Sequence, residues 1–286
     1  MNIAENQLNK SIREQQEMEK IEIELLLEGI FRYYGFDFRN YAYPFLQRRI
    51  LHRVRSEKLN SISALLERVL HQPAMMEKLI ADFSINVTEM FRDPSFFRAF
   101  RAHVVPQLKT HPYIRIWHVG CATGEEVYSM AILLHEEGLY EKTKIYATDM
   151  NQYVLEKAKQ GIFTLDRMQE YTKNYMSAAG TRAFSEYYKA EQGHVSFHSF
   201  LKKNVIFAQH NLVTDRSFNE FHVIICRNVL IYFNKMLQNH VHNLIYESLS
   251  LSGFLGLGIR EGVAYTSHGH KYEEFQPADK IYRKIN

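Results

Sequence analysis

The stretch Trp117-His118-Val119-Gly120-Cys121-Ala122-Thr123-Gly124-Glu125-Glu126 indicates how the larger part of the chain folds. An apolar run ends in a glycine turn, and a helical pattern begins four residues later. In an α/β sheet this is where nucleotide-like ligands bind. Glycines at such a turn let the backbone approach a ligand closely. We therefore expect a strand, a binding turn and a helix in this order.

The two glutamates after the turn bear on the class of ligand. Phosphates favour a helix N-terminus, but Glu125 and Glu126 would repel a pyrophosphate there. The glycine spacing also matches neither the dinucleotide-binding nor the phosphate-loop pattern. A ligand with ribose hydroxyls and a positive centre fits better, and S-adenosylmethionine is such a ligand. Alternatively, Thr123 and Glu126 form a capping box for the helix.

Strand and helix patterns alternate on both sides of this turn, which predicts a parallel sheet covered by helices. A last strand at 282–285 would close the sheet as an antiparallel edge. The expected strands are 114–119, 144–148, 205–209, 222–226 and 253–258, and the expected helices are 125–137, 154–159 and 235–249.

The chain divides by pattern into four parts. Residues 1–20 form a polar leader, either helical or disordered, and 21–84 show the three- and four-residue apolar spacing of an all-helical domain of about four helices. Residues 85–112 would be a linker and connecting helix. Residues 113–286 would be a Rossmann-like domain, with a subdomain inserted at about 163–203, where the alternation stops.

Composition excludes several classes of protein. The 286 residues contain two cysteines, Cys121 and Cys226, which exclude a disulfide framework and favour a reducing compartment. A net charge of +3 does not argue for nucleic acid. The sequence shows no apolar run long enough for a membrane span. His268 and His270 are too isolated to predict a zinc site, so no metal is expected.

Polar residues follow the later strands. Asp149 ends the second strand, where an acidic residue often binds ribose hydroxyls, although it could instead cap the next helix. Asn211-Leu212 follows the third strand and Arg227-Asn228-Val229 follows the fourth, so both should face the same crevice. We interpret the two cysteines as buried wall residues, because no partner that would activate a thiol is evident.

These blocks resemble those of the bacterial chemotaxis receptor glutamate methyltransferases, the CheR-type family. The matching sequences are N-V-T-E-M-F-R-D-P at 86–94, G-C-A-T-G-E-E-V-Y-S at 120–129, A-T-D at 147–149 and C-R-N-V-L-I-Y-F at 226–233. The resemblance extends over nearly the whole chain. It implies an all-helical N-terminal domain, followed by a Rossmann-like S-adenosylmethionine-dependent methyltransferase sheet that bears a small inserted β-subdomain.

The resemblance also implies a site. Arg92 and Tyr232 would lie nearest the transferred methyl group, and S-adenosylhomocysteine would be the product. The implied cofactor contacts are Asn86, Thr88, Arg92, Gly120, Glu126, Asp149, Asn211, Leu212, Asn228 and Val229.

The implied acceptors are glutamate carboxylates on the cytoplasmic helical domain of methyl-accepting chemoreceptors. A glutamate with a reference pKa of about 4.3 is ionised at neutral pH, so no general base is required. We expect a cytoplasmic, monomeric protein recruited to receptor arrays. The basic residues of 47–58, Arg48, Arg49, Arg53, Arg55 and Lys58, face only Glu57 as an acidic neighbour in sequence. They would dock on an acidic receptor helix, unless they form an ordinary solvated helix face.

Two departures from the family pattern stand out. Val127 replaces a usual proline, and Gly258-Ile259-Arg260-Glu261 replaces a G-H-S-E-like block. The arginine is expected to alter the fit of the substrate. Other functions are a cofactor-binding signalling module without turnover, a methyltransferase of another substrate class such as RNA or DNA, and, least favoured, a nicotinamide-dependent dehydrogenase.

Overall fold

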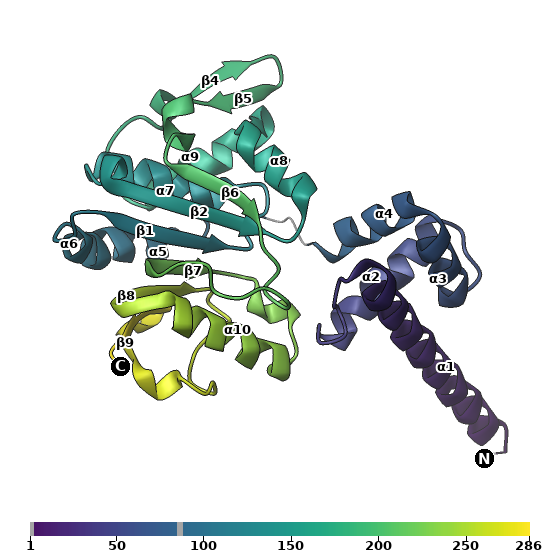
Figure 1. Cartoon of the computed structure of the whole chain (residues 1–286). Helices are drawn as coiled ribbons and strands as arrows, with labels where there is room; N and C mark the ends of the chain where they lie inside the picture. Colours follow the sequence, from purple (N-terminus) through teal and green to yellow (C-terminus); the bar gives the residue numbers. More distant parts are fainter. Residues whose placement is uncertain (1–2, 85–87) are drawn as a thin grey trace. The chain divides into compact units, whose positions relative to one another are not determined.

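The computed structural model describes residues 3–84 and 88–286, with the side chains of 13–84 and 88–286. The chain forms two compact units (Figure 1). The first contains residues up to 85 together with 232–237, and the second contains 86–231 and 238–286.

The first unit is helical, and its helices bury the apolar positions that recur every three or four residues. Proline begins both α2 and α4, and the Ser61 hydroxyl accepts a bond from the Ala64 amide at the start of α3. Leu26, Ile30, Ile50 and Leu65 are almost fully buried among these helices. The helices are α1 (Ile3–Tyr34), α2 (Tyr43–Ser56), α3 (Ile62–His71) and α4 (Pro73–Phe83).

The second unit is built on a seven-stranded sheet in the order β6-β2-β1-β7-β8-β10-β9. The first five strands in this order are parallel, and β10 and β9 pair antiparallel beside them. The strands are β1 (Ile114–Val119), β2 (Thr143–Asp149), β6 (Val205–Gln209), β7 (Phe221–Cys226), β8 (Leu249–Leu257), β9 (Tyr272–Gln276) and β10 (Ile281–Lys284).

The predicted α/β class with a parallel sheet is therefore confirmed, but the C-terminal edge differs. The predicted last strand pairs with β8 as β10, yet it is not at the edge of the sheet, because β9 pairs with its other side. The sequence of β9, Tyr272–Gln276, is short and mostly polar, so it lacks the apolar run used to recognise the other strands.

Helices flank the sheet and the inserted segment. They are α5 (Pro94–Ala99), a π-helical turn (Phe100–Val104), α6 (Val105–Leu108), α7 (Glu125–Glu136), α8 (Gln152–Gln160) and α10 (Lys235–Ser248). The segment after α8 contains α9 (Met168–Ser177) and a small antiparallel sheet in the order β3-β5-β4. Its strands are β3 (Ile162–Thr164), β4 (Tyr188–Glu191) and β5 (His194–Phe197).

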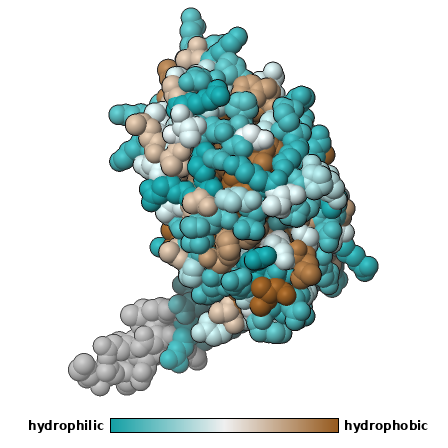
Figure 2. All heavy atoms as spheres, turned by 90° about the vertical axis from the view of Figure 1, so that its left-hand side faces the viewer, coloured by the Kyte–Doolittle hydropathy of each residue, from teal (hydrophilic) through white to brown (hydrophobic). Residues whose placement is uncertain are grey.

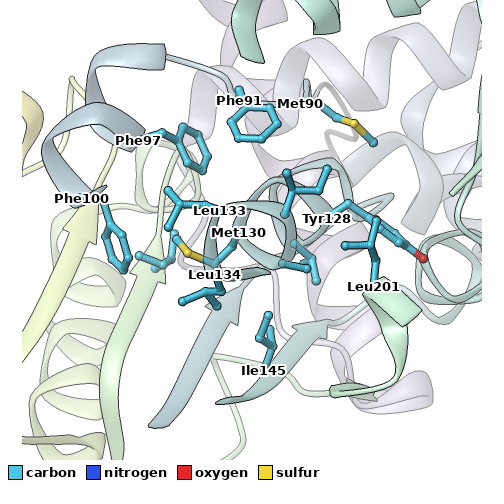
Figure 3. Packing of buried hydrophobic residues seen from close by; sticks show 14 of the residues in the cluster. Met90, Phe91, Phe97, Phe100, Tyr128, Met130, Leu133, Leu134, Ile145 and Leu201 are labelled. Atoms are coloured by element: carbon cyan, nitrogen blue, oxygen red, sulfur yellow. The ribbon is translucent and has the colours of Figure 1, made fainter. Parts of the chain in front are cut away.

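Helix α7 lies at the centre of the hydrophobic core. Phe91, Phe97 and Phe100 gather around its buried face, where Met130 and Leu133 have no exposed surface (Figure 3). The opposite end of this core reaches the small sheet, because the Tyr128 ring lies 5.5 Å from that of Phe197. The first turn of α7, which follows the glycine turn, is thus held by extensive packing. On the face shown in Figure 2, hydrophobic residues are scattered among hydrophilic ones.

Candidate functional site

The predicted site residues of the second unit lie at one edge of the sheet. In the parallel pairing, Val119 is opposite Thr148, and Thr148 is opposite Ala208. The loops that follow β1, β2, β6 and β7 therefore emerge together. Gly120, Asp149, Asn211 and Asn228 are at the ends of these strands or just beyond, as expected for a doubly wound sheet.

The glycine turn has a left-handed backbone at three positions. Gly120 (φ +65°) and Gly124 (φ +93°) allow it, whereas Ala122 adopts φ +47° despite its Cβ atom. The Cys121 amide donates to the Thr148 carbonyl at 2.9 Å, which ties the turn to β2. The predicted capping box does not form, since Gly124 is the N-cap of α7 and the Thr123 hydroxyl donates to Glu125.

Both glycines of the turn pack against protein. A Cβ atom on Gly120 would lie 2.7 Å from Val229 Cγ2, and one on Gly124 would lie 3.0 Å from Ala158 Cβ. The space beside Gly120 is therefore occupied by the loop after β7. This close contact brings two predicted site residues, Gly120 and Val229, together.

Glu126 is held in a buried charge network. Arg227 donates to one carboxylate oxygen at 2.6 Å, and the other is 3.3 Å from His118 Nδ1. Burial alone would raise the pKa of Glu126, but the positive charge of Arg227 and the contact with His118 lower it. Arg227 also donates to the Asp93 carboxylate at 2.6 Å, and its guanidinium lies 4.3 Å from the centre of the Phe96 ring.

Glu125 faces a different environment from Glu126. It is 4% exposed and accepts bonds from Thr123 and, at 3.4 Å, from the Tyr171 hydroxyl of α9. Burial raises the pKa of Glu125. Glu125 therefore bonds to Thr123 and α9, whereas the charge of Glu126 is balanced by Arg227.

Asp149 connects two loops at the end of β2. Its carboxylate accepts bonds from the Ala122 amide at 3.0 Å and the Asn151 amide at 2.9 Å. Burial raises the pKa of Asp149, and these amide bonds oppose that shift. Asp149 is not the cap of α8, because Asn151 is the N-cap and accepts from the Tyr153 amide. The Met150 amide also bonds to this carboxylate. A carboxylate has about four lone pairs, so Asp149 can still accept from a ribose hydroxyl.

Asn211 and Asn228 shape the other two loops. The Asn211 side chain accepts from the Val213 amide at 3.0 Å and folds the loop that contains the half-buried Leu212. Asn228 has a left-handed backbone conformation, with φ +62°, and its backbone amide donates to the Glu261 carboxylate at 2.9 Å.

The segment before α5 reaches the same edge through its backbone. The Arg92 carbonyl accepts from Arg227 at 3.1 Å, and the Phe91 amide donates to the Ser129 hydroxyl of α7 at 2.8 Å. Phe91 and Asp93 both have φ +53°. Such backbone strain in residues other than glycine is typical of functional sites. Thr88 is half-buried, and Asn86 lies outside the described residues.

Tyr232 and the predicted docking arginines belong to the first unit. The Tyr232 carbonyl accepts from the Ala42 amide at 2.8 Å, and its ring lies 5.1 Å from that of Phe45. On α2, Arg48 and Arg55 are exposed.

Two further arginines of α2 are less accessible. Arg49 is half-buried, and its guanidinium lies 5.9 Å from the centre of the Phe45 ring. Arg53 donates twice to the Asp82 carboxylate, at 2.7 and 2.9 Å, and its side chain is 14% exposed. Arg53 therefore helps to join α2 to α4, which leaves Arg48 and Arg55 as the accessible cations among the four.

Sequence reasoning missed several residues that build the edge. Arg227 belongs to one of the matching blocks, but its ion pairs with Glu126 and Asp93 join residues more than 100 positions apart. His118 is 1% exposed and would be taken for an ordinary strand residue. The presence of Arg, Asp and Glu beside strand ends was a usable signal, because buried charges require partners.

The cysteines are buried, at 6% exposure for Cys121 and 0% for Cys226, and burial raises the pKa of both thiols well above the usual value. The burial of both thiols agrees with the interpretation of the two cysteines as buried wall residues. Across 3–84 and 88–286, no group of three or more potential metal ligands is found. In the same part of the chain, no helix has the length and apolar character to cross a membrane.

Comparisons with known proteins agree with this architecture. The family model described as the CheR methyltransferase all-alpha domain matches residues 21–84, and that of the CheR methyltransferase SAM binding domain matches residues 86–278. The chain is 51% identical over 264 residues to "Putative methyltransferase Cher3" of Pseudomonas putida, covering 92% of this chain and 97% of that one.

More distant relatives carry a more specific name. "Chemotaxis protein methyltransferase" of Listeria monocytogenes is 26% identical and covers 80% of this chain and 85% of its own. "Chemotaxis protein methyltransferase 2" of Pseudomonas aeruginosa is 29% identical, with 84% and 86% covered. The family models match most of the chain, so this protein belongs to the CheR methyltransferase family and is an S-adenosylmethionine-dependent methyltransferase.

Proposed function

We propose that this methyltransferase transfers the methyl group of S-adenosylmethionine to glutamate side chains of chemoreceptors and forms methyl esters in chemotactic adaptation. The observation that carries this proposal is that relatives named chemotaxis protein methyltransferase match more than three quarters of the chain, across both units. The acceptor would be the cytoplasmic helical domain of a methyl-accepting receptor. The enzyme would act as a cytoplasmic monomer recruited to receptor arrays.

The cofactor would bind at the carboxyl edge of the sheet. Asp149 would accept a bond from a ribose hydroxyl, in addition to its bonds from backbone amides. Gly120, Glu126, Asn211, Leu212, Asn228 and Val229 would form the rest of the wall, with Asn86, Thr88 and Arg92 from the preceding segment. When bound, the cofactor supplies a methyl group attached to a positively charged sulfur.

The residues would then perform a positioning task. The acceptor carboxylate is already ionised at neutral pH, so its oxygen can form the new bond without a base. His118, the histidine next to the glycine turn, is 1% exposed and cannot reach an acceptor in solvent. Arg92 would orient the acceptor carboxylate through its planar guanidinium, and Tyr232 would help to align the reacting groups.

The decisive experiment is transfer of labelled methyl from S-adenosylmethionine to receptor-containing membranes, followed by mild alkali. We expect the label to be released as volatile methanol, which identifies a carboxyl methyl ester. Label that survives alkali would instead indicate N-methylation and another substrate class. Cofactor binding with no transfer to any of a panel of receptors would indicate a signalling module.

A further inference from the structure

We propose that Ile259 and Arg260 form an acceptor-recognition element, which binds an acidic segment of the protein substrate beside the glutamate that is methylated. The proposal rests on the proposed function, since it names the residues that recognise the acceptor of that same site. It concerns the tight turn that follows β8, in the second unit.

The turn presents these two residues at its tip. The Glu261 amide donates to the Gly258 carbonyl at 2.9 Å, which closes a four-residue turn with Ile259 and Arg260 at its two central positions. Ile259 is 59% exposed, and Arg260 is also exposed. A large apolar side chain and a cation are thus directed to solvent from adjacent positions.

A single buried carboxylate fixes the turn to the candidate site. Glu261 is 7% exposed and accepts bonds from the Gly258 amide at 2.7 Å and the Asn228 amide at 2.9 Å. Its other oxygen accepts from the amides of Leu230, at 2.8 Å, and Ile231, at 3.3 Å. Hydrogen bonds to an ionised acceptor are among the stronger ones in proteins. The tip and the loop after β7 therefore form one rigid assembly.

The same assembly places the tip next to a predicted cofactor residue. A Cβ atom on Gly258 would lie 2.9 Å from both the amide nitrogen and the side-chain nitrogen of Asn228. Gly258 and Asn228 are thus in direct contact at the carboxyl ends of the neighbouring strands β8 and β7. A substrate that reaches the cofactor over Asn228 would pass beside Ile259 and Arg260.

The charge at the tip is available for a partner. Within the described residues, no hydrogen bond or ion pair engages the Arg260 guanidinium, whereas Arg227 at the same edge is paired with Glu126 and Asp93. An unpaired arginine binds carboxylates well, because its planar group presents several donors. The exposed Ile259 adds an apolar contact. Together they suit a protein segment that carries further carboxylates near the acceptor glutamate.

Receptor methylation kinetics test this assignment. With receptor-containing membranes as substrate, R260A should raise KM for the receptor about three- to tenfold and leave kcat near the wild-type value. R260E should raise KM further, and R260K should retain part of the effect. R260A and R260E should weaken the salt dependence of KM, because a charge at the rim of a site acts through long-range attraction. R260K keeps the charge and should keep the salt dependence.

Lys144 provides a matched control. It is an exposed cation near the amino end of β2, whereas the candidate site lies at the carboxyl ends of the strands. K144A should therefore leave KM for the receptor unchanged. Cofactor affinity, measured by calorimetry without receptor, should be the same in R260A and wild type. E261Q should instead weaken both cofactor binding and receptor use, because it releases the loop that contains Asn228.

Three results would contradict these proposals, and they distinguish an error in the role of Arg260 from an error in the proposed function. An unchanged KM at low ionic strength in both R260A and R260E would overturn the assignment. A loss of cofactor affinity in R260A equal to the rise in KM would also overturn it, since Arg260 would then support the cofactor loop. Wild-type enzyme that forms no alkali-labile methyl on any receptor would refute the proposed function itself, and with it this inference.

Discussion

Arg227 and Glu126 form a 2.6 Å ion pair that joins the end of β7 to the first turn of α7. Arg227 also binds the Asp93 carboxylate and the Arg92 carbonyl. One buried cation therefore links three segments that each carry a predicted cofactor or catalytic residue. The Arg227 side chain is 2% exposed, whereas those of Glu126 and Asp93 are 19% and 26% exposed, so salt screens these pairs less than it would screen pairs at the surface.

Replacing this cation should damage both stability and binding. In R227M, Glu126 and Asp93 lose their shared partner, and breaking a buried ion pair in this way costs about 3–5 kcal/mol. We expect a loss of unfolding free energy of that size in urea titrations, together with weaker cofactor binding by calorimetry. A second variant, R227M/E126Q, should recover part of the stability. A single variant as stable as wild type would mean that the pair is weak.

Glu126 should also give stability a measurable pH dependence. Its pKa is lowered in the folded state from the ordinary value of 4.5, so its contribution is complete above about pH 4.5 and is lost as the pH falls through the folded value. The buried groups Asp149, Glu125 and Glu261, whose pKa values are raised, have the opposite sign. Urea unfolding from about pH 7 to about pH 3.5 should therefore show a shallower acid loss in E126Q than in wild type. Parallel curves would contradict this.

Gly120 should tolerate no side chain. A Cβ atom there would meet Val229 at 2.7 Å, and the residue has φ +65°, so G120A should lose about 2–4 kcal/mol. Gly138 is a suitable control, because it has φ +69° but nothing within 4 Å of an added Cβ. G138A should cost only about 1 kcal/mol of backbone strain. Thermal unfolding distinguishes the two, and V229A should partly rescue G120A. Equal losses in the two alanine variants would show that contact with Val229 is unimportant.

The fold was predictable where local patterns and tertiary packing agree. The apolar runs of β1, β6 and β7 and the glycine turn before α7 appear in the structure within about one residue of their predicted positions. Strand β9 was not predictable from its own sequence, since Tyr272–Gln276 has no apolar run, although the strand pairs with β10 and its Phe275 packs against the core.

The sequence predicted which residues follow the ends of the strands, but it did not predict which charged side chains pair with one another. That Asp149 and Asn228 would emerge at one edge follows from parallel strand order. That Glu126 would pair with Arg227, and Arg53 with Asp82, depends on which side chains meet after folding. Sequence spacing carries no information about those contacts. The alternative of a capping box at Thr123 and Glu126 was therefore wrong. Docking through Arg48, Arg49, Arg53 and Arg55 stays a prediction, and the sequence did not show that Asp82 engages Arg53.

The accessible arginines of α2 should govern encounter with the receptor. If the proposed docking is correct, R48A/R55A should raise KM for receptor membranes about fivefold or more and flatten its salt dependence, while kcat stays unchanged. R53A should behave differently, since loss of its pair with Asp82 lowers thermal stability of the helical unit. Lys144, at the amino end of β2, again serves as the exposed control. A KM that does not respond to R48A/R55A at low salt would exclude docking through α2.

The side chain of Arg92 should act in the transfer step itself. Arg227 holds this residue through its backbone carbonyl, so R92A keeps that contact while it removes the side chain beyond Cβ, the guanidinium included. If that group orients the acceptor carboxylate, kcat should fall about 100-fold, as for loss of a positioned donor in other active sites. R98A is the matched control, because Arg98 is exposed on α5 and donates to the Ser177 carbonyl of α9. Rapid mixing with labelled cofactor and saturating receptor measures the step directly. An R92A enzyme with wild-type transfer rate and cofactor affinity would remove Arg92 from the mechanism, whatever acceptor the enzyme uses.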